Sequence, residues 1–123
     1  MPRSKILVVD DEPSILSTLR AILGAQGYET AGATSGEEAI RLACSFEPDF
    51  ILSDVGMGGI NGIDAVIRIL EFQPQCKALF ISGHAMCHDL LTQARKQGFD
   101  FEILAKPVSP VELLGKISRV LAA

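Results

Sequence analysis

Five polar side chains that could carry chemistry stand directly after short apolar segments of the chain. They are Asp10, Asp11, Asp54, Ser82 and Lys106. Carboxylates gathered at one point repel one another, and a hard divalent cation such as Mg²⁺, which prefers oxygen ligands, relieves that repulsion. A lysine and a hydroxyl beside them could hold phosphoryl oxygens. Together these residue types predict phosphoryl transfer to a carboxylate, with Asp54 as the nucleophile.

The segment around Asp54 is the centre of this interpretation. An apolar run, residues 50–52, leads through Ser53 to Asp54, and a glycine-rich stretch, residues 56–62, follows. A buried strand that ends in a carboxylate and gives way to a loop places that carboxylate on the rim of a sheet. The alternative is that Asp54 only caps a turn, because Asp is a common turn residue.

Each of the other residues also has a purely structural interpretation. Asp10 and Asp11, with Glu12, could simply complement the positive end of a following helix. Ser82 could cap a helix or turn, and Lys106 could be a solvated loop lysine. Their shared position, at the same end of successive strands, is harder to attribute to chance than any one of them alone.

The elements that must position these residues alternate along the chain. Strands are predicted over residues 5–9, 28–31, 50–54 and 77–81 and within 99–105, and helices are predicted to start near residues 13, 35, 61, 87 and 109. This alternation predicts an α/β fold, a flavodoxin-like three-layer α/β/α sandwich with five helices and a five-stranded parallel sheet in the order 2-1-3-4-5. We expect residues 1–123 to form a single domain.

Composition excludes several classes of protein. The formal net charge of −4, with no run of Lys and Arg, argues against direct binding to nucleic acid. Cys44, Cys76 and Cys87 have no Cys-x-x-Cys spacing, so reduced thiols are expected rather than disulfides or a zinc site. The sequence has no signal peptide and no apolar run of membrane-spanning length, which predicts a cytoplasmic protein without membrane contact.

As a set, these residues resemble the response-regulator receiver domain of two-component signalling, the fold of the bacterial chemotaxis regulator. The resemblance covers essentially the whole chain. Its matching residues are Asp10 and Asp11, Asp54 with Met57 and Gly62 behind it, Ser82 and Gly83, and Lys106 and Pro107.

The resemblance implies a role for each acidic residue. Asp54 resembles the phosphoacceptor of the family. Asp10 and Asp11 resemble its magnesium-binding acidic pair, and the backbone carbonyl of Gly56 resembles a further metal ligand. Mg²⁺ is therefore the cofactor that the resemblance implies.

The resemblance also implies a switch. Ser82 is similar to the hydroxyl that turns inward to hold the phosphoryl group, and Lys106 to the lysine that bonds it and forms a cis peptide with Pro107. Ile103 stands where the family has a Tyr or Phe that moves with the hydroxyl, which puts the coupled movement in doubt. Phe101 could substitute for that aromatic, or it could simply pack in the core.

Further departures from the family pattern lie in the loops. Gly58 replaces a usual proline, which predicts a more mobile loop. The segment 98–106 is one residue longer than usual, which predicts a bulge or a longer loop before the fifth strand. Gly56 leaves the path for attacking water open, and His84 either lies over the site and alters hydrolysis or is an exposed turn histidine.

The function that the resemblance implies is a phosphorylation-dependent signalling switch. It would accept a phosphoryl group on Asp54 from a histidine kinase or a histidine phosphotransfer protein, and change a face that binds a downstream protein or a fused output domain. Its only catalysis would be its own phosphorylation and dephosphorylation. The alternatives are a degenerate receiver that binds partners constitutively, a Mg²⁺-dependent phosphohydrolase, and a flavin-binding carrier.

Overall fold

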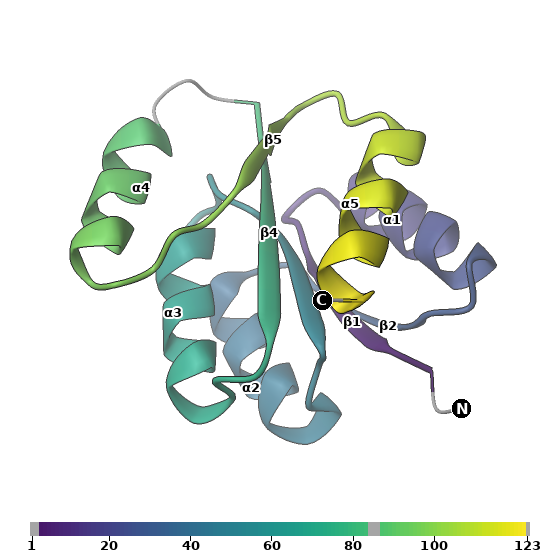
Figure 1. Cartoon of the computed structure of the whole chain (residues 1–123), viewed down its shortest axis with the longest axis horizontal. Helices are drawn as coiled ribbons and strands as arrows, with labels where there is room; N and C mark the ends of the chain where they lie inside the picture. The colour runs from purple at the N-terminus through teal and green to yellow at the C-terminus, as the bar shows by residue number, and fades with distance from the viewer. Residues whose placement is uncertain (1–2, 84–86, 123) are drawn as a thin grey trace.

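The computed structural model describes residues 3–83 and 87–122 (Figure 1). Strands and helices alternate throughout this part of the chain. The strands are β1 (Lys5–Val9), β2 (Glu29–Ala33), β3 (Phe50–Asp54), β4 (Lys77–Ser82) and β5 (Ile103–Ala105). The helices are α1 (Pro13–Ala25), α2 (Gly36–Phe46), α3 (Gly62–Phe72), α4 (Cys87–Lys96) and α5 (Pro110–Ala122). None of these helices is both long and apolar enough to cross a membrane.

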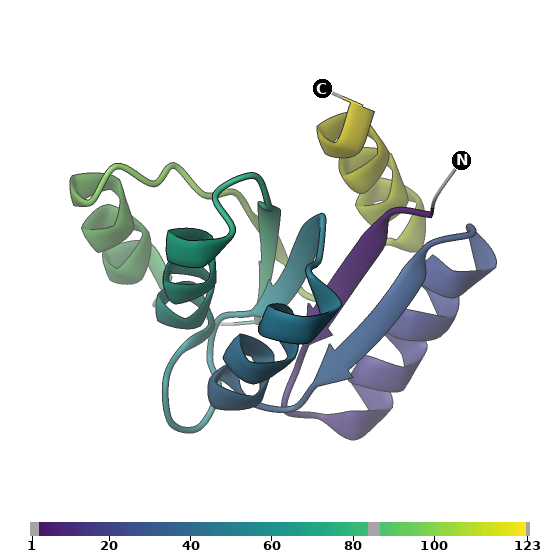
Figure 2. The same ribbon diagram turned by 90° about the horizontal axis from the view of Figure 1, so that it is seen from below.

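The strands form one parallel sheet in the order β2-β1-β3-β4-β5, which confirms the predicted fold. Helices α1 and α5 cover one face of the sheet, and α2, α3 and α4 cover the other (Figures 1 and 2). Because all strands run the same way, their carboxyl ends meet at one edge. That edge is where Asp54 ends β3.

The strands are continuous apolar runs because both faces of the sheet are buried. Along β1, Leu7 and Val9 join the core beneath α2, α3 and α4, whereas Ile6 and Val8 join the core beneath α1 and α5. None of these four side chains is more than 2% exposed. The central strands are therefore fixed from both sides and provide a rigid base for the groups that follow them.

The two outer strands, β2 and β5, differ most from their predicted extents, and β4 continues one residue further than predicted, to Ser82. Strand β2 begins after Tyr28 and continues to Ala33, because its residues pair in register with the whole of β1 despite the weak strand propensity of Gly32. Strand β5 is limited to Ile103–Ala105, so residues 99–102 form a longer loop rather than a bulged strand. Its partner is the end of β4, with Phe80 opposite Ile103.

The two ends of the described chain lie near each other, away from the carboxyl edge of the sheet (Figure 2). Residues Arg3, Ser4 and Lys5 line one groove together with Leu121 near the end of α5. Strand β1 starts at this groove and runs to the opposite end of the sheet, where Asp10 and Asp11 follow it.

Candidate functional site

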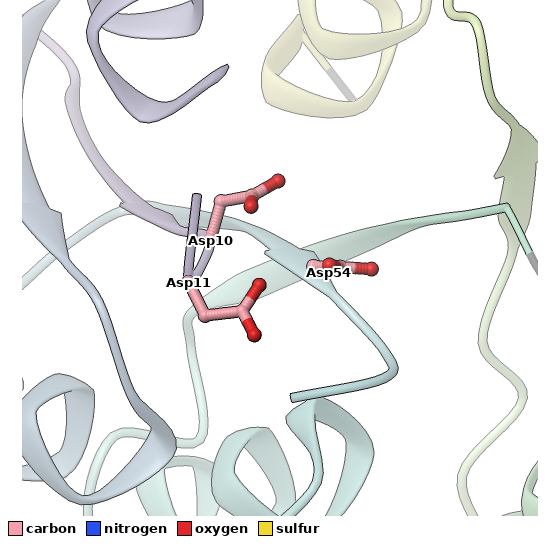
Figure 3. A group of neighbouring side chains, drawn as sticks. All are labelled: Asp10, Asp11 and Asp54. Carbon is pink, nitrogen blue, oxygen red and sulfur yellow. The ribbon is translucent and has the colours of Figure 1, made fainter. Parts of the chain in front are cut away.

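Three carboxylates gather where β1 and β3 end (Figure 3). Asp10 and Asp11 come from the turn after β1, and Asp54 is the last residue of β3. One carboxylate oxygen from each lies within 4.8 Å of the others. Asp10 and Asp54 are buried and Asp11 is exposed, so the cluster is embedded in the sheet edge and open to solvent on one side.

Lys106 reaches this cluster from the loop after β5. Its Nζ lies 3.3 Å from Oδ2 of Asp10 and 3.3 Å from Oδ2 of Asp54. Its backbone N–H donates to the Ser82 carbonyl at 2.9 Å, which ties the loop to the end of β4. The peptide between Lys106 and Pro107 is cis, as the resemblance implied.

The turn after β1 fixes the orientation of Asp10. The backbone N–H of Asp10 donates to the carbonyl of Ala33 at 3.1 Å, which continues the pairing of β1 with β2. The N–H of Glu12 donates to Oδ1 of Asp10 at 2.9 Å. Because Glu12 is also the N-cap residue of α1, the carboxylate is held by the start of that helix.

The start of α3 fixes the backbone of Asp54. The Ser53 hydroxyl donates to the Asp54 carbonyl at 2.8 Å, and the N–H of Gly62 donates to the carbonyl of Val55 at 2.9 Å. A Cβ at Gly62 would lie 1.9 Å from the Asp54 carbonyl oxygen and 2.7 Å from Ser53 Oγ. Only glycine therefore lets α3 approach the end of β3 this closely.

Comparison with known proteins then identifies the family. The family model of the response regulator receiver domain matches residues 6–118 of this chain. The chain belongs to this family. Chemotaxis protein CheY of Thermotoga maritima is 34% identical over 119 residues, which cover 94% of this chain and 98% of that protein. A CheY-like receiver domain from Methanospirillum hungatei has a TM-score of 0.90 at 27% identity, with 98% of this chain and 95% of that chain covered.

Other relatives are longer than this chain. The DNA-binding response regulator MtrA of Mycolicibacterium smegmatis is 30% identical over 115 residues, which cover 94% of this chain and 49% of that protein. The chain thus spans about half the length of this relative. Receiver domains are signalling domains that interact with histidine kinases and with output domains, rather than metabolic enzymes. Membership therefore disfavours the phosphohydrolase and flavin-carrier alternatives.

The acidic residues of this receiver domain suit the cation that the family binds. Receiver domains hold Mg²⁺ at an acidic pocket, and Mg²⁺ takes one or two carboxylates together with waters and phosphoryl oxygens. The cluster of Asp10, Asp11 and Asp54 offers hard oxygen donors, and the exposed side of Asp11 leaves room for water. The donor set fits the ion.

Burial and neighbouring charges shift the pKa values of two groups of the site, the Asp54 carboxyl and the Lys106 ammonium. Burial raises the pKa of the Asp54 carboxyl, Lys106 opposes this shift and Asp10 adds to it. Burial by itself would lower the pKa of the Lys106 ammonium, but the charges of Asp54 and Asp10 outweigh it and raise that pKa. The lysine therefore remains a fixed positive charge beside a desolvated carboxylate.

Three further residues were predicted for the site, namely Ser82, Gly56 and His84, and the structure describes the first two. Ser82 is buried at the end of β4, where it pairs with Ala105 immediately before Lys106. Gly56 lies in the exposed loop two residues after Asp54, and the role of its carbonyl stays a prediction. His84 lies outside the described residues.

Ile103 and Phe101 belong to the core beneath α4 rather than to the cluster of charges. Ile103 is half-buried in β5. The ring of Phe101 meets that of Phe80 edge to face at 5.0 Å and stacks on that of Phe99 at 5.5 Å. These contacts give Phe101 a packing role, which was the simpler of the two interpretations of its position.

Two features that position the site were not predicted from the sequence: the close approach of Gly62 to Ser53 and the Asp54 carbonyl, and the bond of Lys106 to Asp10. Gly62 was predicted to open a helix and to match the family pattern, and Ser53 had no predicted role. Ser53 lies on β3 and Gly62 opens α3. The sequence signal for their close approach was a small residue at each of the two positions.

Proposed function

We propose that this receiver domain is a signalling switch that accepts a phosphoryl group on Asp54 from a histidine kinase or a histidine phosphotransfer protein. The observation that supports this proposal is the contact of the Lys106 ammonium with Asp54 inside a cluster of carboxylates. A nucleophilic carboxylate, a metal-binding acidic pair and a fixed cation are the parts that phosphoryl transfer requires. A cytoplasmic location belongs to the same proposal.

In the proposed reaction, an oxygen of Asp54 attacks the phosphorus of a phosphohistidine on the donor protein. The new P–O bond forms as the P–N bond breaks, and the electron pair of the P–N bond returns to the imidazole of the donor. Asp10, Asp11, Asp54 and the carbonyl of Gly56 would hold Mg²⁺, and the bound ion would neutralise phosphoryl charge.

Two further side chains hold the product in this proposal. Lys106 exchanges its contact with the Asp54 carboxylate for a contact with a phosphoryl oxygen. The Ser82 hydroxyl turns to donate to another phosphoryl oxygen. Because Lys106 and Ser82 are joined through the backbone at 2.9 Å, movement at Ser82 reaches β5 and the adjoining helices. A changed face of α4, β5 and α5 would then bind a downstream protein or a fused output domain.

Intact mass spectrometry tests the acceptor. The native chain is incubated with acetyl phosphate, with and without Mg²⁺, beside Asp54→Asn and a control, Asp100→Asn, which removes an exposed carboxylate outside the site. We expect one phosphoryl group on the native chain and the control, only with Mg²⁺, and none on Asp54→Asn. A folded native chain that binds Mg²⁺ yet gains no mass would contradict the proposal.

A degenerate receiver that binds partners constitutively is the second candidate. The observation that favours it is Ile103, an aliphatic residue at the switch position, together with Phe101 held between two other rings. The two candidates differ in whether phosphorylation changes the structure. NMR spectra of α4, β5 and α5 before and after phosphorylation separate them: unchanged signals would favour the constitutive module.

A further inference from the structure

An apolar pocket lies beside the acidic cluster, on the face of the sheet that α1 and α5 cover. Its volume is about 570 Å³, a size typical of pockets that hold small ligands. One wall is formed by α1 and the other by residues 106–110, the segment that leads into α5. Most of the lining side chains are aliphatic, among them Ile15, Leu19, Ile22 and Val108. The pocket therefore suits an apolar group of a ligand.

The side chain of Asp54 lies on the same face of the sheet as this pocket. Side chains alternate between the two faces along a strand, and Leu52, two residues before Asp54, belongs to the core beneath α1 and α5. The register partner of Asp54 on β4 is Ile81, which belongs to the same core and lines the pocket. The pocket therefore begins next to the carboxylate, at the neighbouring strand.

Lys106 joins the acidic cluster to the pocket. Its side chain is part of the pocket wall, and its Nζ lies 3.3 Å from Oδ2 of Asp54. An ammonium in this place attracts the phosphoryl group of an anionic ligand, while the aliphatic wall beside it favours an apolar tail. The two surfaces are continuous, so together they fit a small molecule with a phosphoryl head and an apolar tail.

The direction of phosphoryl transfer brings such a tail to the pocket. The attacking and leaving oxygens lie roughly in line on opposite sides of the phosphorus. Because Asp54 attacks from the sheet, the leaving group points away from the sheet, into the layer of α1 and α5. There it would pass between the first turn of α1 and the segment after β5, where Ser14 and Pro107 line the pocket on opposite sides.

We propose that this pocket receives the acyl chain of a second class of phosphodonor, small acyl phosphates, and favours chains longer than acetyl. An oxygen of Asp54 attacks the phosphorus, and the new P–O bond forms as the P–O bond to the acyl group breaks. The electron pair of that bond leaves on the released carboxylate. Each methylene that enters the pocket is removed from water, which strengthens binding. This inference rests on the proposed role of Asp54 as the acceptor.

Intact mass spectrometry of the full chain with acetyl, butanoyl and hexanoyl phosphate, at one Mg²⁺ concentration, tests the proposal. The three released carboxylates have nearly equal basicity, so the donors differ mainly in the length of the apolar chain. We expect kcat/KM for phosphorylation to be about tenfold higher with butanoyl than with acetyl phosphate, because two further methylenes are buried. Hexanoyl phosphate should react at least as well as butanoyl phosphate.

Variants that fill the pocket test where this preference arises. Thr18→Phe places a ring in the pocket, and Val108→Phe does so from the opposite wall. Ser17→Phe is the matched control, because Ser17 is an exposed neighbour of Thr18 on α1 that is not among the lining residues. We expect the ratio of kcat/KM for butanoyl and acetyl phosphate to fall to about one in the two filled variants, and to stay at about ten in the control.

Equal kcat/KM of the native chain for acetyl and butanoyl phosphate would overturn the inference, while labelling of Asp54 by acetyl phosphate would still support the proposed acceptor. A preference for butanoyl phosphate that persists in a folded filled variant would also overturn it, since the preference would then not come from the pocket. A folded native chain that binds Mg²⁺ and is labelled by none of the three donors would contradict the proposed function and this inference together.

Discussion

Three glycines between the end of β3 and the first residue of α3 have different structural surroundings. Gly62 is pressed against the carbonyl of Asp54. Gly59 has a φ of +79°, in the left-handed region that side chains disfavour, and Glu37 lies against it. Gly58 has open space around it and is not in that region. Substitutions at these positions should therefore have different effects on stability.

We expect Gly62→Ala to destabilise the fold by about 3 kcal/mol, because the new methyl group must push apart backbone atoms at the end of β3. Gly59→Ala should cost about 1 kcal/mol through backbone strain. Gly58→Ala is the matched control and should stabilise the fold by about 0.5 kcal/mol, since it restricts only the unfolded chain. Urea unfolding measures all three, and native stability of Gly62→Ala would contradict the close approach of α3.

Asp54 makes the stability of the metal-free chain depend on pH. Because burial raises the pKa of its carboxyl in the folded state, that state binds the proton more tightly than the unfolded state does. Stability is therefore lost as the pH rises from the ordinary Asp pKa, about 3.9, through the raised one. Lys106 opposes this loss but keeps Asp10 as a partner when Asp54 is neutral.

We accordingly expect Asp54→Asn to be more stable than the native chain by about 1 kcal/mol at neutral pH without divalent metal, since like charges are removed. Thermal unfolding in a chelating buffer, at neutral pH and near pH 4, checks this. The difference should shrink at the lower pH, where the Asp54 carboxyl gains its proton in the folded state and is about half protonated in the unfolded state. An Asn variant less stable than the native chain at neutral pH would show that the lysine contact dominates instead.

At the scale of elements, the loop of residues 99–102 joins three parts of the fold. Phe101 packs against Phe80 of β4. Asp100 pairs with Arg95 of α4 at 3.6 Å, and Glu102 pairs with Lys116 of α5. The segment before β5 is therefore a loop that contacts α4, β4 and α5, rather than a bulge within the strand.

We expect Phe101→Leu to lower the stability by about 1 kcal/mol, because the edge-to-face contact with Phe80 is lost while the apolar volume is largely kept. Acetyl phosphate should still label the variant fully, since Phe101 lies outside the acidic cluster. Urea unfolding and intact mass measure the two effects. A stable variant that loses phosphorylation would instead assign Phe101 a part in the switch.

At the scale of the whole molecule, the sequence allowed the fold and the gathering of the acidic residues to be predicted for one physical reason. Strands buried on both faces must be continuous apolar runs, and parallel strands bring their carboxyl ends to one edge. The features that could not be predicted depend on contacts through space. Lys106 and Asp10 are 96 residues apart, and only the folded sheet makes them partners.

The boundaries of the outer strands, β2 and β5, could not be predicted from the sequence either, because they also depend on contacts through space. The end of β2 is set by its pairing with β1 rather than by its own residues, among which Gly32 favours no strand. Strand β5 starts only at Ile103, although the hydrophobicity of Phe99 and Phe101 favoured an earlier start, and these two rings stack on each other in the loop. Neither pairing nor ring stacking leaves a periodic pattern in the sequence.

The groove shared by residues 3–5 and Leu121 has a practical consequence for protein engineering. A short linker between the two ends would convert the chain into a covalent ring, which could be cut open at a different loop to give a circular permutant. The linker would lie away from the carboxyl edge of the sheet (Figure 2). That edge carries Asp10, Asp54 and Lys106. Such a permutant could carry a reporter close to α4 while the acidic edge of the sheet remained unobstructed.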